Sequence, residues 1–242
     1  MTPEGQILDL LKSWAPEINR LLTKAGYFDL PRDSTQKSEI AKAIGLDKNG
    51  KLYKQVLAAS KEKNSNISQI VLNEISLREF KAGARKVAQE LNIPFSQWDW
   101  NDGAQNYFDK EGLKLVTEMS QTDIDSLRQR VQYDFNLEPK AFADRYADSY
   151  SCSPARLERI KRSETHTAGQ DGGFQFASDA GAGWKQWMCT PRGIYPRSPH
   201  REIWYEVVPI DEAFSNGQMY PSDPNCRCYL IYLFDPSEAK HG

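Results

Sequence analysis

The chain has few cysteines and no long apolar run among its 242 residues. Its four cysteines are too few and too clustered for a disulfide scaffold, so we expect free thiols in a reducing cytoplasm. No apolar run approaches the roughly 20 residues that a membrane span needs. The stretch MTPEGQILDL also lacks the basic and then apolar order of a secretion signal. We therefore expect a protein without a membrane partner that is made and kept inside a cell, or inside a particle assembled there.

Recognisable catalytic motifs are missing as well. The sequence contains no G-x-S-x-G, H-E-x-x-H, P-loop or G-x-G-x-x-G pattern, and its three histidines leave little room for acid–base catalysis. Arg162, Ser163 and Glu164 are the residue types of ADP-ribosyltransferase sites, but those enzymes place them on separate strands. We therefore favour a structural Arg–carboxylate pair at this point and predict no catalytic residue.

The net charge is small, but it is uneven along the chain. A formal net charge of −2 argues against a general nucleic-acid coat. Residues 154–201 hold eight Lys and Arg against four Asp and Glu, whereas residues 202–242 hold two against seven. We favour neutralisation within one folded unit. The alternative is a basic face for a phosphate backbone or an acidic partner.

Helical periodicity dominates the chain up to about residue 168. Pro16 is expected to break or kink the first helix. Ser76 and Glu79 match a capping box, and Ser153 followed by Pro154 matches a helix start. A loop is expected at residues 94–106. Residues 38–60 are predicted to form two short helices around an Asp-Lys-Asn-Gly turn at 47–50. The other predicted helices cover residues 6–22, 76–92, 120–136, 138–150 and 153–169.

The pattern changes after about residue 170. Glycines and prolines become frequent, and we interpret Gly172 and Gly173 as turn residues. Strand-like runs follow at residues 183–190, 201–210 and 228–234. The sequence therefore predicts an α+β protein, in which a helical N-terminal region is followed by a smaller Gly- and Pro-rich α+β module.

Two of the cysteines stand one residue apart in the stretch YPSDPNCRCYL, at Cys226 and Cys228. Two thiolates can bind Zn²⁺, although structural zinc sites usually separate such cysteines by two to four residues and need four ligands. Cys189, His200, Cys226 and Cys228 make a chemically complete ligand set, and His166 is a further candidate. The alternatives are packing as small apolar groups on one strand face, which we favour, and redox chemistry. Zn²⁺ is thus a candidate cofactor.

Several short segments between residues 120 and 232 follow a recognisable order. A helix ends in RSET, AGAGWKQW follows, then RSPH, then PIDEAFSNGQMYPSDPNCRC. This order resembles the MuF-like minor head protein family, also called the head morphogenesis family, of tailed bacteriophages. Ser163 stands where the family usually has Thr, and the usual Asp-Gly after His200 is not evident. The residues that carry the resemblance are Arg162, Glu164, Thr165, Gly183, Lys185, Trp187, Arg197, His200, Phe214, Tyr220, Pro221, Asp223, Asn225, Cys226, Arg227 and Cys228.

The resemblance implies a structural role. It implies a virion or procapsid component at or near the portal vertex, active in head assembly and in DNA packaging or delivery. The implied partners are the portal protein, other capsid or scaffolding proteins and double-stranded DNA. The implied location is the virion, after synthesis in the host cytoplasm. The motif residues that are then expected to be structural are Arg162, Glu164, Trp187, His200, Asp223, Asn225 and Arg227.

The resemblance also suggests a division of the chain. Residues 120–242 would form the MuF-like α+β module, helical to about residue 168 and built of short strands after it. Residues 1–119 lie outside the resemblance, and we predict a helical docking region there because charged amphipathic helices suit a groove on a protein partner. The alternative function is a transferase or toxin-like enzyme built on residues 160–232.

Overall fold

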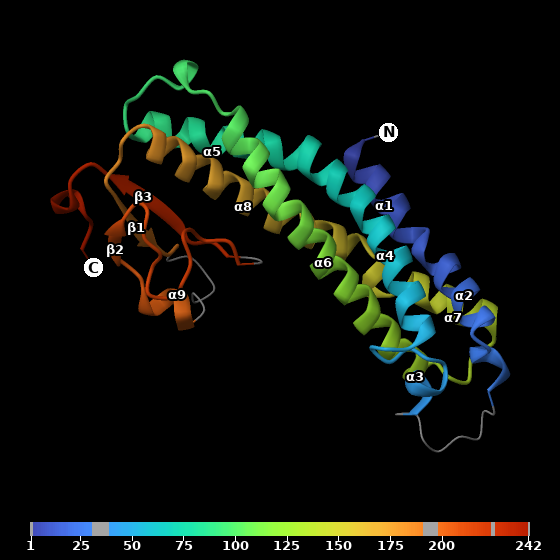
Figure 1. Cartoon of the computed structure of the whole chain (residues 1–242). Helices are drawn as coiled ribbons and strands as arrows, with labels where there is room; N and C mark the ends of the chain where they lie inside the picture. The colour runs from blue at the N-terminus through green and yellow to red at the C-terminus, as the bar shows by residue number, and fades with distance from the viewer. Residues whose placement is uncertain (1, 31–38, 191–197, 224–225, 242) are drawn as a thin grey trace. The chain divides into compact units, whose positions relative to one another are not determined.

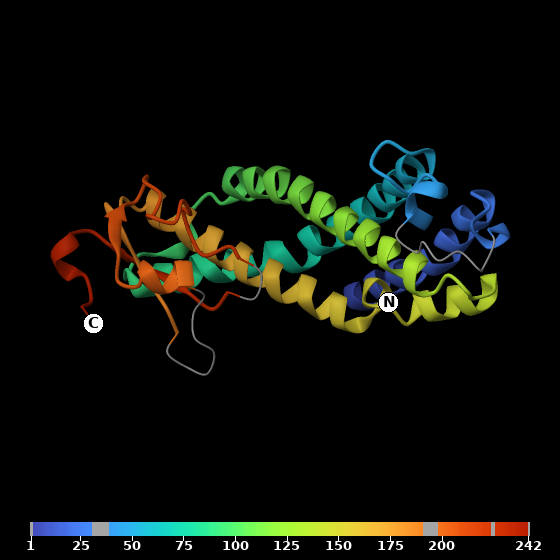
Figure 2. The same cartoon turned by 90° about the horizontal axis from the view of Figure 1, so that it is seen from below.

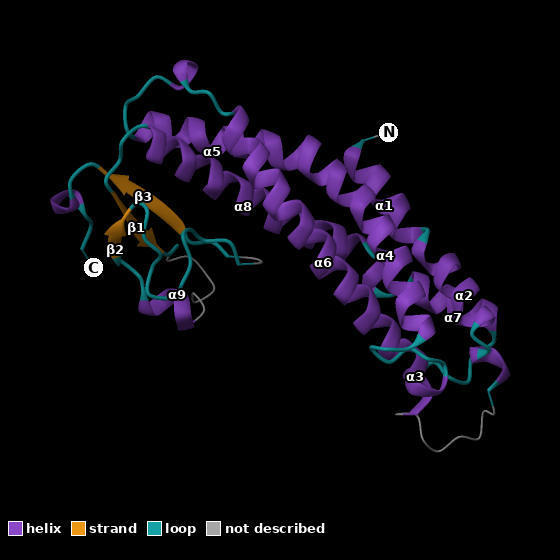
Figure 3. Ribbon diagram, in the orientation of Figure 1, coloured by secondary structure: helices purple, strands orange, loops and turns teal. Residues whose placement is uncertain are grey.

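A computed structural model of the chain describes residues 2–30, 39–190, 198–223 and 226–241. Helices make up most of this part, and a three-stranded sheet lies near the C-terminus (Figures 1 and 3). The fold therefore confirms the predicted α+β class. The helices and strands are α1 (Pro3–Lys12), α2 (Trp14–Lys24), α3 (Ile40–Ala43), α4 (Lys51–Ile70), α5 (Leu77–Glu90), α6 (Asn101–Tyr133), α7 (Pro139–Ala147), α8 (Pro154–Asp179), β1 (Trp184–Met188), α9 (Ser198–Glu202), β2 (Val207–Pro209) and β3 (Tyr229–Leu233).

The chain divides into two compact units. Unit 1 comprises Met1–Ile70 and Lys110–Glu158, and unit 2 comprises Val71–Asp109 and Arg159–Gly242. Each unit combines sequence from both sides of residue 119. The division at residue 119 follows the extent of the resemblance and stays a prediction.

The core of unit 1 is built from apolar faces of α2, α4, α6 and α7. Tyr27 lies in its middle, with its ring edge-on to Phe28, Phe135 and Phe142 at centroid distances of 4.9, 6.1 and 5.5 Å. Its hydroxyl donates to the Val131 carbonyl at 3.0 Å, so the buried polar tip has a partner. The fully buried apolar members of this core include Ile18, Leu22, Leu46, Val56, Ile124, Leu127, Val131 and Tyr146.

Unit 1 also buries a cluster of charged side chains. Asp123 is 0% exposed and accepts hydrogen bonds from Lys63 Nζ at 2.8 Å, from Ser60 Oγ at 2.5 Å and from Arg156 Nη1. Arg156 also donates through Nη2 to the Met119 carbonyl at 3.0 Å. Burial lowers the pKa of Lys63 to about 8, whereas the two neighbouring cations hold the pKa of Asp123 below its usual value against the effect of burial. A buried charge is tolerated only when it is paired in this way.

Unit 2 begins with two helices that touch backbone to backbone. A Cβ atom built on Gly83 of α5 would lie 1.9 Å from the Gly169 carbonyl oxygen, and one built on Gly172 of α8 would lie 2.0 Å from the Phe80 carbonyl oxygen. Only glycine permits this approach. The prediction that Gly172 and Gly173 are turn residues is wrong, because α8 continues past residue 168 to Asp179.

The sheet of unit 2 has the strand order β2-β1-β3, with both pairs antiparallel. The register pairs Lys185 with Val208 on one side, and Trp184 with Leu233 and Met188 with Tyr229 on the other. The three strands and α9 lie together at the C-terminal end of the chain in both views (Figures 1 and 2). The ring of Trp187, on β1, packs edge-on against that of Phe214 at a centroid distance of 5.1 Å.

Some local predictions are confirmed and others are wrong. Ser153 Oγ accepts from the Arg156 backbone N–H at 3.3 Å at the start of α8, as predicted. The break between α1 and α2 lies at Ser13, before Pro16. Ser76 is already helical and makes no capping bond, because a π-helix at Val71–Ser76 leads directly into α5. The expected loop at residues 94–106 ends early, where α6 begins at Asn101.

Within the described ranges, no helix combines the length and apolar character needed to cross a bilayer. All four cysteines are free thiols.

Candidate metal centre

The ends of β1 and β3 bring two of the predicted ligands together. Because the antiparallel register pairs Met188 with Tyr229, its extension by one residue places Cys189 opposite Cys228. Their Sγ atoms lie 3.4 Å apart, and the Cys189 thiol also donates to the His200 carbonyl at 3.4 Å. Both side chains are buried.

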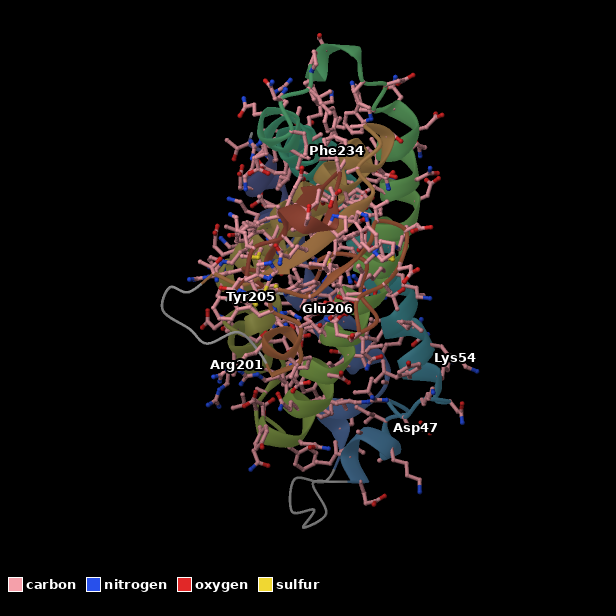
Figure 4. All side chains as sticks on the ribbon, turned by 90° about the vertical axis from the view of Figure 1, so that its left-hand side faces the viewer. Asp47, Lys54, Arg201, Tyr205, Glu206 and Phe234 are labelled. Carbon is pink, nitrogen blue, oxygen red and sulfur yellow. The ribbon has the colours of Figure 1, made fainter. Side chains whose placement is uncertain are left out.

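The turn between α9 and β2 holds His200 against β1. The Tyr205 backbone N–H donates to the Trp187 carbonyl at 2.9 Å, and the Trp187 N–H donates to the Glu206 carbonyl at 3.0 Å. Tyr205 has a φ of 73°, a strained value for a non-glycine residue, at this point. Figure 4 labels Tyr205 and Glu206, next to each other in this turn. The Trp187 ring then lies edge-on to the His200 imidazole at 5.2 Å.

The imidazole of His200 has a partner at each ring nitrogen. Nδ1 lies 3.5 Å from Cys226 Sγ and 3.6 Å from Cys228 Sγ. Nε2 lies 2.9 Å from Asp223 Oδ2, and the other oxygen of Asp223 accepts from Gln218 Nε2 at 2.8 Å. Since a carboxylate only accepts, Nε2 donates to Asp223, and Nδ1 faces the two sulfur atoms.

The thiols of Cys226 and Cys228 shift each other's pKa in opposite directions. The pKa of Cys226 is lowered to about 4, first by its hydrogen bond with Cys228 and further by His166, while the pKa of Cys228 is raised by the same contact and by burial. The Cys228 backbone N–H also donates to Cys226 Sγ at 3.3 Å. His166 extends from α8, and its Nε2 atom is buried and has no hydrogen-bond partner in the described structure.

These five side chains form one group, which we call the thiol–imidazole cluster: His166, Cys189, His200, Cys226 and Cys228. Three of its ligand atoms, from His200, Cys226 and Cys228, lie within 4.8 Å of one another. Such a group of soft sulfur and imidazole donors can hold a tetrahedral metal ion. The predicted set is therefore brought together in space from three places: Cys189 follows β1, His200 lies on α9, and Cys226 and Cys228 precede β3.

The remaining motif residues differ in burial and in contacts. Trp187 is fully buried, and Asp223 supports His200 as described above. Arg162 and Arg227 are exposed, and the Arg227 carbonyl accepts from Thr190 Oγ1 at 2.6 Å. Asn225 and Arg197 lie outside the described residues.

The alternative of a transferase needs Arg162, Glu164 and His200 around a solvent-filled cleft. Glu164 is only 8% exposed and His200 only 3% exposed. Both nitrogens of His200 are already occupied by Asp223 and the two thiols. These observations do not favour a role for His200 as an acid or base toward a bound substrate.

Lys185, a further residue of the motif, lies on β1 with no exposed surface. Its Nζ donates to the Ile210 carbonyl at 2.8 Å and lies over the rings of Phe174 and Phe214, at 4.9 and 5.4 Å. Burial lowers the pKa of this amine to about 8. The side chain thus ties the segment after β2 to β1 and belongs to the framework that supports the cluster.

Sequence reasoning missed two features of the site. The pairing of Asp223 with His200 was not predicted, although the carboxylate stands only three residues before Cys226. His166 was named as a candidate but left out of the predicted set. Only its residue type made His166 a candidate. The helical pattern around it does not indicate which later segment of the chain packs against it.

Comparisons of this chain with protein-family models, with curated proteins and with solved structures found no match.

Proposed function

We propose that this chain is a minor head protein of a tailed bacteriophage, which binds at the portal vertex and acts in head assembly. The observation that carries the proposal is the convergence of the motif residues. Trp187, His200, Asp223, Cys226 and Cys228 come from three separate segments and meet around one imidazole ring. If these motifs stood in this order by chance, there would be no reason to expect their residues to meet in the folded structure.

The burial of these residues supports an architectural role within the proposal. His200 and Cys228 are 3% and 4% exposed, and Trp187 is fully buried. A group that binds and releases substrates needs an opening to solvent, whereas a group that fixes the fold of a module does not. The proposed task of this part of the chain is to hold the α+β module in shape.

Docking to the portal is assigned to the helical region at residues 1–119, as the sequence suggests. Its helices carry an apolar face into the core and leave charged side chains outside, including Asp47 before α4 and Lys54 on α4 (Figure 4). Charged amphipathic helices of this kind suit a groove between protein subunits.

The test is co-expression of the chain with the portal protein of the same phage, followed by affinity capture and crosslink mapping. We expect the portal protein to be captured and the crosslinks to fall within residues 1–119. A portal protein from an unrelated phage serves as the matched control and is expected to stay unbound. Failure to capture the portal protein, together with absence of the chain from purified heads, would overturn the proposal.

A further inference from the structure

The spacing of the ligand atoms in the thiol–imidazole cluster matches the edges of a tetrahedral zinc site. With Zn–S bonds of about 2.3 Å and Zn–N bonds of about 2.0 Å, the nitrogen and sulfur ligands of a tetrahedron lie about 3.5 Å apart. The measured distances from His200 Nδ1 to Cys226 Sγ and to Cys228 Sγ are 3.5 and 3.6 Å. Two edges of such a tetrahedron are therefore already in place.

The surroundings of His200 are those of a metal ligand. Nε2 is bound to the Asp223 carboxylate, which is itself held by Gln218. This pairing fixes the ring orientation and directs Nδ1 toward the two sulfur atoms, as supporting carboxylates do for metal-binding histidines. The same arrangement is not needed for packing, since an apolar side chain would fill the space without a buried polar atom.

The fourth ligand comes from α8. His166 contacts the Cys226 thiol, and its Nε2 atom is buried with no hydrogen-bond partner in the part of the chain that the structure describes. A buried imidazole nitrogen without a partner is costly unless something else binds it. Neither His166 nor Cys189 belongs to the close set of three. Cys189 Sγ lies 3.4 Å from Cys228 Sγ, but its thiol already donates to the His200 carbonyl, so we assign the fourth position to His166.

We propose that unit 2 binds one Zn²⁺ ion through the His166 imidazole, His200 Nδ1, Cys226 Sγ and Cys228 Sγ, with Asp223 orienting His200 and Cys189 packed behind Cys228. The donor set of two thiolates and two imidazoles is that of closed, structural zinc sites. The ion joins α8, α9 and the segment before β3, which are separated from one another along the chain. This proposal does not depend on the proposed function, because it concerns how unit 2 is held together.

The first test is the metal content of the full chain, purified without chelator from cells grown with added zinc. We expect one zinc ion per chain by elemental analysis. The apo chain, loaded with Co²⁺, is expected to show the visible bands of tetrahedral coordination and a sulfur-to-cobalt charge-transfer band. A wild-type chain that holds no zinc and gives an octahedral Co²⁺ spectrum would overturn the proposal. This measurement needs no variant and so does not depend on whether a variant folds.

The ligand set is tested by competition of the variants with a zinc-binding dye. Cys226→Ser combined with Cys228→Ser is expected to abolish zinc binding. Asp223→Asn is expected to weaken it about 10–100-fold, as for other supporting carboxylates, and His166→Ala is expected to weaken it further. Cys189→Ser and His241→Ala, which changes an exposed histidine near the C-terminus, are the matched controls and are expected to bind as the wild type does. Loss of zinc in Cys189→Ser with retention in His166→Ala would overturn the assigned ligand set.

Discussion

Unit 1 and unit 2 bury ionisable groups in opposite ways. In unit 1 the carboxylate of Asp123 is matched by Lys63 and Arg156, and hydrogen bonds from neighbouring side chains complete the cluster. In unit 2 two thiols and the Asp223 carboxylate converge on the His200 imidazole. The difference teaches that a buried charged cluster can be completed by protein groups alone, whereas the cluster of unit 2 has the composition of a site that an ion completes.

Metal removal is expected to have the largest effect and to separate the two units. A structural zinc ion contributes on the order of 10 kcal/mol to the folding of small zinc domains. After chelation of the full chain, hydrogen exchange followed by mass spectrometry should rise sharply in β1 and β3 and stay unchanged in α2, α4 and α7. Re-addition of zinc is the control and should restore protection. Equal changes in both units, or none, would contradict the comparison.

Asp123→Ala is expected to give the next largest effect, confined to unit 1. The change leaves the cations of Lys63 and Arg156 buried without their partner, and breaking a buried pair in this way costs about 3–5 kcal/mol. Urea unfolding and hydrogen exchange of α4 and α7 measure the loss.

The matched control for Asp123 is Asp125→Ala, on the same helix. Asp125 is 59% exposed and pairs with Arg128 at 3.6 Å, so its loss should cost only about 0–1 kcal/mol. Zinc content should be unchanged in both variants. A large loss from Asp125→Ala, or exchange that rises mainly in the strands after Asp123→Ala, would show that the two units are not stabilised separately.

Gly172→Ala is expected to destabilise unit 2 without removing its ligands. The new Cβ would lie 2.0 Å from the Phe80 carbonyl oxygen, so α5 and α8 must move apart. Overpacking of this kind costs about 1–3 kcal/mol. Gly169→Ala is the matched control three residues earlier on α8, because its Cβ would lie 3.7 Å from the nearest atom, the Glu79 carbonyl oxygen. If both variants unfold at the same urea concentration, the backbone contact of these helices does not limit stability.

Gly172 also shows where sequence reasoning fails. A glycine pair in a helical stretch is ordinarily typical of a turn, and that interpretation ended the last helix near residue 168. In the structure the small size of Gly172 serves a helix crossing, and the helix continues to Asp179. The contact is with a residue some 90 positions away, which no local pattern reveals. The predicted capping box at Ser76 is wrong for a similar reason. A π-helix leads directly into α5 and leaves no free helix end to cap.

The candidate site was predictable in its chemistry and only partly in its members. Residue types alone brought Cys189, His200, Cys226 and Cys228 together as a hypothesis, because few other soft ligands are present in the chain. The strand register that places Cys189 opposite Cys228 is a property of three dimensions, as is the approach of His166 from α8. Fold class was the easier prediction, since it rests on periodicities of 3.6 and 2 that each segment carries by itself.

The smallest expected effect is a gain of stability in unit 2 from Gly103→Ala. Gly103 lies in the first turn of α6, and a Cβ there would make ordinary contacts of 3.5 and 3.7 Å with Phe80 Cζ and Gln175 Cγ. Because alanine restricts the unfolded chain more than glycine does, the change should stabilise by about 0.4–1 kcal/mol. Urea unfolding of the zinc-loaded chain measures it. The same substitution then has opposite signs at Gly103 and Gly172 within one unit, and the sign depends on whether a backbone carbonyl or a side chain faces the new methyl group. A loss at Gly103 as large as that at Gly172 would mean that unit 2 tolerates added volume nowhere along its helices, and that close packing, in addition to any ion, limits its stability.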